Sequence, residues 1–481
     1  MSETLAPDLC VIGAGSAGLS VAAGAAAFGE SVVLVEKGRM GGDCLNTGCV
    51  PSKALIAAAR HAQAVREAAE FGIGARLEAP APGTAGALAP VAAHVRSVIE
   101  AIAPNDSVAR FTGLGVRVVA GEARFADPET LRVGDLSIRG RRFVVATGSR
   151  PLVPPIPGLS DVSYLTNESL FDLEDLPARL VVLGGGPIGI EMAQAFRRLG
   201  SEVVVLEAER ALSRDDPELA AIVTARLRAE GVVIREGARA TAVSRRAGGG
   251  VVVTVEGGGE TRAEAGSHLL VAVGRRPDIA ALDLDAAGIA HGPRGIAVDA
   301  RLRTSNRRVF AIGDVNGGPQ FTHWAAYQAD RVLRTILFRF GGRLDPDVLP
   351  WATYTDPELV QVGLTEHQAR TRFPNVSTLS WPFSENDRAW TERDTTGLVK
   401  LVVGPRGRIL GAGIVGRSAS ELAGIYALAI AGRLGVRALS GLVLPYPTRG
   451  ETARRAAVSY YAPFAGSPVL RRLIRLLKRL G

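Results

Sequence analysis

The chain has 481 residues, of which 47% are hydrophobic, enough for a large core and about three domains of ordinary size. The formal net charge is +8, but the excess is spread over many arginines without a nucleic-acid-binding motif, so we expect no nucleic-acid partner. With only 3 cysteines, no secretory signal and no apolar run long enough to span a bilayer, we expect a cytoplasmic protein without a disulfide framework.

The first motif is a strand, a glycine-rich turn and an alanine-rich helix. An apolar strand at 8–12 precedes the turn, and a second strand at 31–35 ends on Glu36. The glycines of the turn are Gly13, Gly15 and Gly18. Such glycines let the backbone approach a pyrophosphate at the helix N-terminus, and the acid accepts hydrogen bonds from ribose hydroxyls. The pattern predicts a dinucleotide site.

Two cysteines, Cys44 and Cys49, follow this unit with four residues between them. Pro51 suits the first turn of a helix, which we expect to continue to about Phe71. A helix N-terminus stabilises a thiolate, and the spacing allows both sulfurs to come within disulfide distance. We interpret the two as a redox-active pair; the alternative is two buried, inert thiols. Lys53 lies one helical turn after Cys49 and can face the same side.

The strand–turn–helix pattern occurs a second time. A strand near 143–147 ends at Thr147 and Gly148, and a proline-rich stretch after it marks a crossing between domains. A new apolar strand at 180–183 then leads into a second glycine turn. Its glycines are Gly184, Gly186 and Gly189. Two such units imply two bound dinucleotides.

The second unit also indicates a choice of nicotinamide cofactor. Its second strand ends on Glu207, whose carboxylate can accept from a free 2′-hydroxyl and repels a 2′-phosphate. This favours NADH, although Arg210 and Arg214 keep NADPH open. Gly274 closes this part of the chain after another strand.

The remaining sequence contains three further landmarks. A strand ends at Gly313 and Asp314, whose acid can bind a chain of sugar-like hydroxyls. A helix then begins near His323 and Ala325; His323 has either an active-site role or a structural one at the helix N-terminus. From about residue 349 the pattern changes to strands and an apolar helix at 420–431, which suits a dimer interface or a core.

Together these motifs resemble the flavoprotein pyridine nucleotide–disulfide oxidoreductases, from about Asp8 to about Pro463. The resemblance rests on both glycine-rich units, the cysteine spacing with Lys53, the Gly313-Asp314 strand end and the Tyr354-Thr355-Asp356-Pro357 segment. It implies an α/β fold with two Rossmann-like domains and a C-terminal α+β dimerisation domain. The expected boundaries are 1–155 with 275–345 for the FAD domain, 156–274 for the NAD(P) domain, 346–465 for the dimerisation domain and 466–481 for a tail.

The resemblance also implies a mechanism in a homodimer. Hydride from NAD(P)H would pass to FAD and on to the Cys44–Cys49 pair, with Cys49 against the flavin and Cys44 meeting the substrate. Lys53 matches the family lysine near flavin N5, and Glu191 matches its ion partner. The FAD residues would include Gly13, Gly15, Gly18, Glu36 and Asp314, and the NAD(P)H residues Gly184, Gly186, Gly189 and Glu207. Further cofactor-binding candidates are Gly42, Thr147, Gly148, Gly313, His323, Ala325 and Gly274.

One departure from the family pattern concerns the substrate. The lipoyl and glutathione enzymes carry a His and a Glu in the last motif, where this chain has Tyr446 and Glu451. A tyrosine with a pKa near 10 does not replace an imidazole base at neutral pH. The mercuric-reductase-like branch also has Tyr there, yet this chain lacks the C-terminal cysteine pair that commonly delivers the metal.

We therefore expect an FAD-dependent NAD(P)H oxidoreductase acting on a small disulfide or related acceptor. The alternatives are a metal-ion reductase of the mercuric-reductase type, a dihydrolipoyl dehydrogenase and a low-turnover flavoprotein redox sensor. No metal-binding residues are predicted.

The C-terminal segment 469–480 has a separate pattern. At helical spacing its basic residues fall on one side and its apolar residues on the other. The basic residues are Arg471, Arg472, Arg475, Lys478 and Arg479. We expect an amphipathic helix that either packs on the dimer or lies on an anionic membrane at the inner face.

Overall fold

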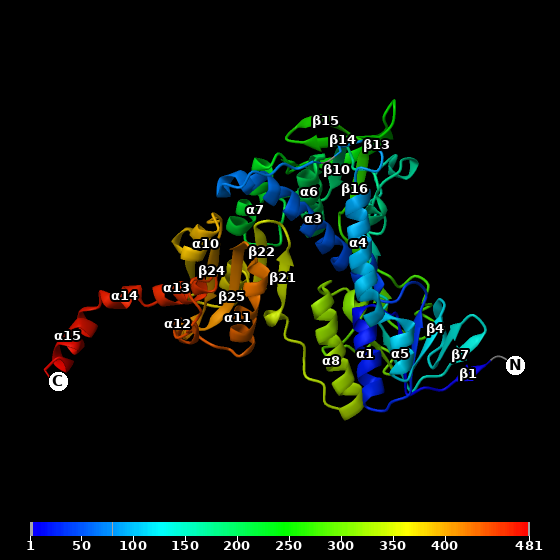
Figure 1. Ribbon diagram of the computed structural model, residues 1–481. Coiled ribbons are helices and arrows are strands. Elements are labelled where there is room, and N and C mark those ends of the chain that lie inside the picture. The colour runs from blue at the N-terminus through cyan, green and yellow to red at the C-terminus, as the bar shows by residue number, and fades with distance from the viewer. Residues whose placement is uncertain (1–2, 79, 480–481) are drawn as a thin grey trace. The chain divides into compact units, whose positions relative to one another are not determined.

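The computed structural model describes residues 3–78 and 80–479; residues 480–481, the end of the predicted tail, lie outside this part. The chain folds into two compact units. The first comprises Met1–Gly185, Ala195–Ala208 and Gly237–Leu344, and the second comprises Gly186–Gln194, Glu209–Glu236 and Asp345–Gly481. Figure 1 labels their helices and strands.

A five-stranded parallel sheet is the centre of the first unit, with the strand order β20-β8-β2-β3-β4. The strands are β2 (Leu9–Ile12), β3 (Val32–Glu36), β4 (Val116–Ala120), β8 (Arg142–Val145) and β20 (Val309–Ala311). Alternate residues of β2 enter separate cores: Leu9 and Val11 face one, and Cys10 and Ile12 face the other. Burial on both faces explains why these strands read as continuous apolar runs.

Two helices cover one face of this sheet. They are α1 (Ser16–Ala27) and α8 (Thr322–Phe338), whose alanines and valines share the core of Leu9 and Val11. The cysteine segment forms α2 (Gly42–Asn46) and α3 (Cys49–Glu67), and α4 (Ala89–Ile102) follows. The helix predicted to reach Phe71 ends at Glu67, and a 3₁₀ turn at Ala68–Phe71 stops at Gly72 in the left-handed conformation.

A second set of parallel strands in the first unit has the order β11-β10-β16. These are β10 (Arg179–Leu183), β11 (Glu202–Leu206) and β16 (His268–Val271), and α6 (Pro187–Leu199) follows the glycine turn after β10. Three antiparallel strands between β11 and β16 in the sequence form a separate sheet: β13 (Arg239–Arg245), β14 (Val251–Gly257) and β15 (Glu260–Gly266). Both glycine turns thus lie at the carboxyl ends of parallel strands, where α/β sheets bind ligands.

The second unit contains a five-stranded antiparallel sheet with the order β21-β22-β25-β24-β23. Its strands are β21 (Pro350–Thr353), β22 (Glu358–Gly363), β23 (Ser377–Pro382), β24 (Leu398–Val403) and β25 (Ile409–Gly416). The main helices are α7 (Pro217–Ala229), α11 (Ala419–Ala431), α12 (Val436–Ser440) and α13 (Glu451–Ser459). Within the described residues, no helix combines the length and apolarity needed to cross a membrane.

A buried lysine joins three acidic side chains in this unit. Lys400 on β24 places its Nζ 2.9 Å from Asp216, 3.0 Å from Glu218 and 2.8 Å from Glu366. Burial alone would lower the pKa of Lys400, but hydrogen bonds to the three carboxylates outweigh it and raise that pKa. The lysine therefore stays charged and ties α7 and α9 (Glu366–Arg372) to the sheet.

We expect Lys400→Met to lower the free energy of unfolding by about 3 to 5 kcal/mol, because it leaves Asp216 buried without its counter-ion. The loss should be largest near neutral pH. The Lys400 hydrogen bond lowers the pKa of Glu366 in the folded protein. The ion pair therefore stabilises the folded state while the Glu366 carboxylate is ionised, and this stabilisation is lost as the pH falls through the acid range. Urea unfolding at several pH values measures this; Lys478→Met, on an exposed helix end, is the control, and equal effects of the two substitutions would contradict it.

Candidate active site

The first glycine turn has the shape of a phosphate-binding loop. A Cβ at Gly13 would lie 2.5 Å from the carbonyl oxygen of Ala146, and one at Gly18 would lie 1.9 Å from that of Gly13. At Gly15, by contrast, the nearest atom is 4.0 Å away. No side chain caps the N-terminus of α1, so its first N–H groups face this space. The turn therefore fits the pyrophosphate of a dinucleotide.

Glu36 is fixed at the end of the next strand. Its carboxylate accepts hydrogen bonds from the N–H of Ala14, at 2.6 Å, and from the N–H of Gly38, at 2.7 Å. These bonds hold the acid beside the turn, where its remaining lone pairs can accept from ribose hydroxyls. The position of Glu36 thus agrees with the role expected for it in FAD binding.

The cysteine segment rests directly on this turn. The N–H of Gly41 donates to the carbonyl of Ala14 at 2.9 Å, and a Cβ on Gly42 would lie 2.8 Å from the Cα of Gly15. Only glycines allow this approach of two backbones, and Gly42 also has a positive φ of 58°. The contact places Cys44, at the centre of α2, next to the dinucleotide turn.

The two thiols form one hydrogen-bonded pair. Cys44 lies within α2, and Cys49 is the first residue of α3. The hydrogen bond from Cys44 lowers the pKa of Cys49 to about 6, against the opposing effect of burial; Thr322 and Lys53 lower it further. The Cys49 Sγ is 3.6 Å from the Thr322 Oγ1 at the start of α8. The same pairing and burial raise the pKa of Cys44, so Cys49 is the more acidic of the two thiols.

A polar network ties the cysteine segment to the end of β8. Arg275 approaches the Asp43 carboxylate at 3.3 Å, and it donates to the Ser149 hydroxyl and the Ser149 carbonyl, both at 2.8 Å. The Asn167 amide donates to Asp43 at 2.9 Å and to the Thr47 carbonyl at 3.1 Å. Because Asp43 precedes Cys44 directly, this network fixes the position of the thiol pair.

Ser149 continues the network to Asp314. Its hydroxyl donates to the Asp314 carboxylate at 2.5 Å, and burial raises the pKa of that carboxyl while the hydrogen bond and Arg275 oppose the rise. The neighbouring Gly313 N–H donates to Gln328 on α8 at 2.7 Å, which fixes the strand end against that helix. A half-buried acid held in this way can accept from the hydroxyls of a sugar-like chain.

The other candidates of the first unit follow β8 or lie at the start of α8. Thr147 donates its hydroxyl to the Asp278 carbonyl at 2.7 Å, and Gly148 has a positive φ of 71°. Ala325 is buried near Gly313, whereas His323 is exposed on the first turn of α8 and stacks on Phe321 at 5.4 Å.

The second glycine turn repeats the features of the first. A Cβ on Gly184 would lie 2.4 Å from the carbonyl oxygen of Ala272, while Gly186 has no atom within 4 Å. Glu207 accepts the N–H of Gly185 at 2.6 Å, as Glu36 accepts that of Ala14. Gly274 follows β16 with a positive φ of 131°. The residues of this turn therefore fit a second dinucleotide.

The second unit carries the remaining candidates. Glu191 on α6 is 5% exposed and accepts the N–H of Tyr354 at 2.9 Å. Tyr446 is 71% exposed and donates its phenol to Asp387 at 2.8 Å. That bond raises the pKa of Tyr446, with a smaller contribution from Glu451 at the start of α13, so the phenol stays protonated at neutral pH. The structure thus brings Tyr446 and Glu451 within electrostatic range of each other.

Sequence reasoning missed four side chains of these clusters. Thr322 and Arg275 stand beside predicted residues, at a helix start and after a glycine, but no pattern gave them a role. Asn167 and Asp387 lie outside every motif, and only the folded chain brings them to Asp43 and Tyr446.

Comparison with known proteins identifies the class that this fold and site define. Residues 7–329 match the family model of pyridine nucleotide-disulphide oxidoreductases, and residues 349–457 match the dimerisation domain of the same family. The chain belongs to the pyridine nucleotide–disulphide oxidoreductase family. The predicted fold class, two dinucleotide-binding domains and a dimerisation domain, is confirmed.

Individual relatives cover nearly the whole chain. A mercuric reductase of Streptomyces lividans is 36% identical over 95% of this chain and 97% of its own length. A dihydrolipoyl dehydrogenase of Geobacillus stearothermophilus is 37% identical over 94% and 95%, respectively. Among solved structures, the Cu(II) complex of the HOCl-induced flavoprotein disulfide reductase RclA from Escherichia coli aligns with a TM-score of 0.81, 30% identity and coverage of 93% and 98%.

The family defines the general chemistry. The chain is an FAD-dependent oxidoreductase that takes electrons from NAD(P)H, as the two glycine-rich units predicted. Its dimerisation domain supports a homodimer.

We expect Cys44→Ala to raise the pKa of Cys49 from about 6 toward the ordinary thiol value, because the thiolate loses its strongest hydrogen-bond donor. The rate of iodoacetamide alkylation of Cys49, followed by peptide mass spectrometry, should then rise with pH at a higher midpoint. Cys44→Ser is the matched control, since its hydroxyl still donates and should keep the midpoint low. Identical midpoints in the alanine and serine variants would contradict this account of the thiolate.

Proposed function

We propose that Cys44 and Cys49 form a redox disulfide through which electrons from NAD(P)H reach a small disulfide or a related acceptor. When bound, FAD accepts hydride from NAD(P)H and delivers an electron pair to a disulfide. The observation that supports this proposal is the hydrogen-bonded thiol pair beside the first dinucleotide turn, with Cys49 as its thiolate.

The protein residues account for the second half of such a reaction. Cys44 attacks a disulfide RSSR, forms a mixed disulfide and releases one RS group, which takes the Cys44 proton. The Cys49 thiolate then attacks the Cys44 sulfur, restores the Cys44–Cys49 bond and expels the second RS⁻, which is protonated from solvent. The pair loses two electrons and the substrate gains two. Of the two thiols, Cys49 has the lowered pKa, so it is ready for the second attack.

Cofactor binding follows from the same residues. FAD would lie along Gly15, Glu36 and Asp314 with Lys53 beside it, and the nicotinamide cofactor along Gly186 and Glu207; Glu191 remains a catalytic candidate. We favour NADH, because a 2′-phosphate would meet the Glu207 carboxylate. Arg210, one of the two arginines that keep NADPH open, already donates to the carbonyls of Ser213 and Asp215 at 3.3 Å.

A metal-ion acceptor is the second candidate. A mercuric reductase is among the relatives, and a related flavoprotein disulfide reductase has been solved as a Cu(II) complex. A thiol pair with one thiolate is a soft ligand set that suits such ions. Tyr446 in place of the family histidine weakens the case for lipoamide, because its protonated phenol is directed to Asp387. A redox sensor with negligible turnover remains the third alternative. We also propose the domain boundaries that the sequence predicted: 1–155 with 275–345, 156–274, 346–465 and 466–481.

The decisive experiment is an acceptor screen of the purified protein with NADH and NADPH in parallel. Small disulfides, lipoamide, oxidised glutathione and Hg(II) are compared in wild type and Cys44→Ser. We expect one acceptor to give turnover that falls by about a hundredfold or more in the variant, since serine cannot form the mixed disulfide. Reduction of O₂ should persist in both proteins.

Cys10→Ala is the matched control, because this thiol is fully buried in β2 and takes no part in the exchange. If no acceptor gives Cys44-dependent turnover, the disulfide proposal fails and the sensor alternative gains support. If only Hg(II) gives Cys44-dependent turnover, the protein functions as a metal-ion reductase.

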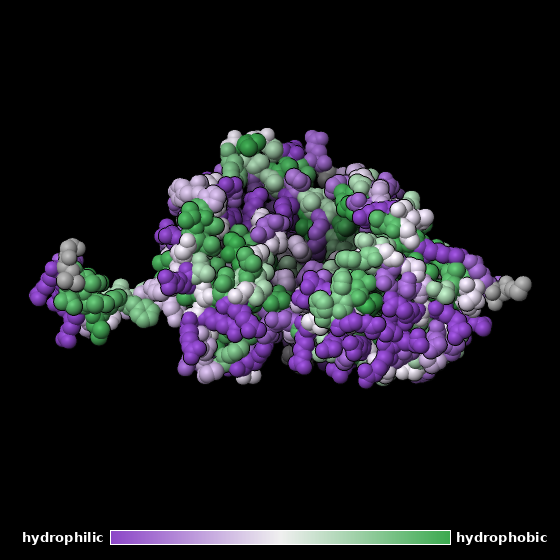
Figure 2. Space-filling view, turned by 90° about the horizontal axis from the view of Figure 1, so that it is seen from below, coloured by the Kyte–Doolittle hydropathy of each residue, from purple (hydrophilic) through white to green (hydrophobic). Residues whose placement is uncertain are grey.

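We also propose that the C-terminal tail contacts an anionic membrane surface from the cytoplasmic side. Helix α15 (Pro468–Leu477) has exposed leucines along one side and arginines along the other, visible as the green and purple sides at the left of Figure 2. No acidic residue follows Glu451, so nothing in this segment offsets its positive charge.

We expect the full-length protein to float with vesicles that contain phosphatidylglycerol, and the Leu473→Glu/Leu477→Glu variant to float several-fold less. The substitutions place carboxylates on the apolar side of α15 without touching a core, because both leucines are exposed. Leu473→Ile/Leu477→Ile keeps that side apolar and should float like wild type. Equal flotation of the Glu and Ile variants would favour packing of the tail on the dimer instead.

A further inference from the structure

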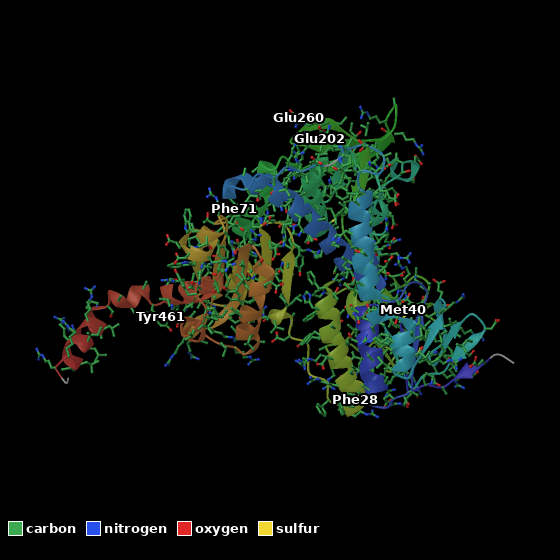
Figure 3. All side chains as sticks on the ribbon, viewed as in Figure 1. Phe28, Met40, Phe71, Glu202, Glu260 and Tyr461 are labelled. Carbon is green, nitrogen blue, oxygen red and sulfur yellow. The ribbon has the colours of Figure 1, made fainter. Side chains whose placement is uncertain are left out.

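Three phenylalanines lie exposed together on the first unit, away from both glycine turns in the sequence. Phe28 follows α1, and Phe338 and Phe340 lie at and just beyond the end of α8. The ring centroids of Phe28 and Phe338 are 5.4 Å apart, and those of Phe338 and Phe340 are 6.0 Å apart. They are 66%, 46% and 71% exposed, respectively. Figure 3 labels Phe28, which lies at the C-terminal end of α1.

Arginines gather beside these rings. Arg339 lies between Phe338 and Phe340 in the chain and has a positive φ of 63°. Arg142 begins β8, and the N–H of the following Phe143 donates to the Arg308 carbonyl at 2.9 Å, so both arginines are at the amino edge of the parallel sheet. Arg303 pairs with Phe310 of the neighbouring strand β20. The guanidinium groups are near enough that Arg141, Arg339, Arg308 and Arg303 lower the pKa of Arg142, in addition to its burial.

Only part of this charge is neutralised within the protein. Arg141 is paired with Asp8 and Glu30, and Arg308 with Glu129. For Arg142, Arg303 and Arg339, the described residues provide no carboxylate within ion-pair distance of the guanidinium. The fold thus holds three like charges close together, which costs free energy unless an anion binds there.

We propose that the aromatic–arginine patch, formed by Phe28, Phe338, Phe340, Arg142, Arg303 and Arg339, docks this unit on an anionic phospholipid surface. The rings enter the boundary between headgroups and acyl chains, and the guanidinium groups bind lipid phosphates. This patch is distinct from the C-terminal tail, because all six residues belong to the first unit and the tail belongs to the second.

Charge and apolar surface together favour a lipid surface as the occupant. Guanidinium groups bind phosphate through several donors, and exposed aromatic rings beside such charges are typical of proteins that lie in the membrane interface. Each arginine near an anionic bilayer strengthens binding about fivefold at physiological ionic strength. Three arginines without carboxylate partners therefore supply an attraction that neutral lipid does not.

The test uses the full-length protein with Leu473→Glu/Leu477→Glu in every sample, so that the tail does not contribute. This protein should bind vesicles of phosphatidylcholine with phosphatidylglycerol, bind phosphatidylcholine alone weakly, and be released by added salt. Arg339→Gln should weaken binding about fivefold, and Phe340→Ser should weaken it by a similar factor. FAD absorbance and NAD(P)H oxidation should be unchanged in both, because neither residue belongs to the catalytic site.

Two matched substitutions on the same unit complete the experiment. Phe71→Ser removes another exposed phenylalanine, labelled in Figure 3. Arg132→Gln removes another exposed arginine, for which residues 3–78 and 80–479 provide no carboxylate partner. Both should bind vesicles like the parent. The proposal is overturned if the tail-substituted protein binds no anionic vesicle, which would leave an acidic protein as the occupant, or if the patch variants bind as well as these controls.

Discussion

The proton shared between Cys44 and Cys49 is the interaction on which the site depends. Two sulfurs in hydrogen-bonding contact hold one proton more readily than two, so one thiol is acidified while its partner keeps its proton. The asymmetry comes from the surroundings. Thr322 and Asp43 act on both thiols, whereas only Cys49 begins α3 and lies near the charge of Lys53. Cys49 is therefore the more acidic thiol of the pair before any substrate arrives.

The rest of the first unit keeps this pair in place. The backbone contact between Gly15 and Gly42 sets the cysteine segment on the dinucleotide turn, and it requires that Gly42 lacks a side chain, because a Cβ there would lie 2.8 Å from the Cα of Gly15. The network through Arg275 and Ser149 connects Asp43 to Asp314. The proposed FAD-binding residues Gly15 and Asp314 are thus linked to the thiols through the same short segment. A change in either end is expected to alter the thiol pair as well.

The second unit carries the motif in which this chain departs from the family pattern. Its tyrosine is held protonated by Asp387, which removes the strong base that disulfide-exchanging relatives with histidine possess. The two surfaces that combine arginine with exposed apolar side chains, one in each unit, are separate from this chemistry. The donor side of the enzyme, FAD and NAD(P)H, follows the family pattern.

The sequence by itself determined the cofactor class, and it predicted the redox pair. Glycines at fixed spacing, the strand-terminal acids and two cysteines before a helix are local features, and their chemistry depends on few neighbours. The second unit's Tyr446 was likewise recognisable from its motif. The family resemblance already implied that Cys49 is the thiolate, but only the tertiary structure showed that Thr322, 273 positions away in the chain, contacts its sulfur. The same holds for Asn167 beside Asp43, for Asp387 beside Tyr446 and for the arginines around Phe338. Such partners come from separate strands and helices. The periodicity of a sequence indicates which face of a helix or strand is buried, but it does not indicate which side chains of other elements contact that face.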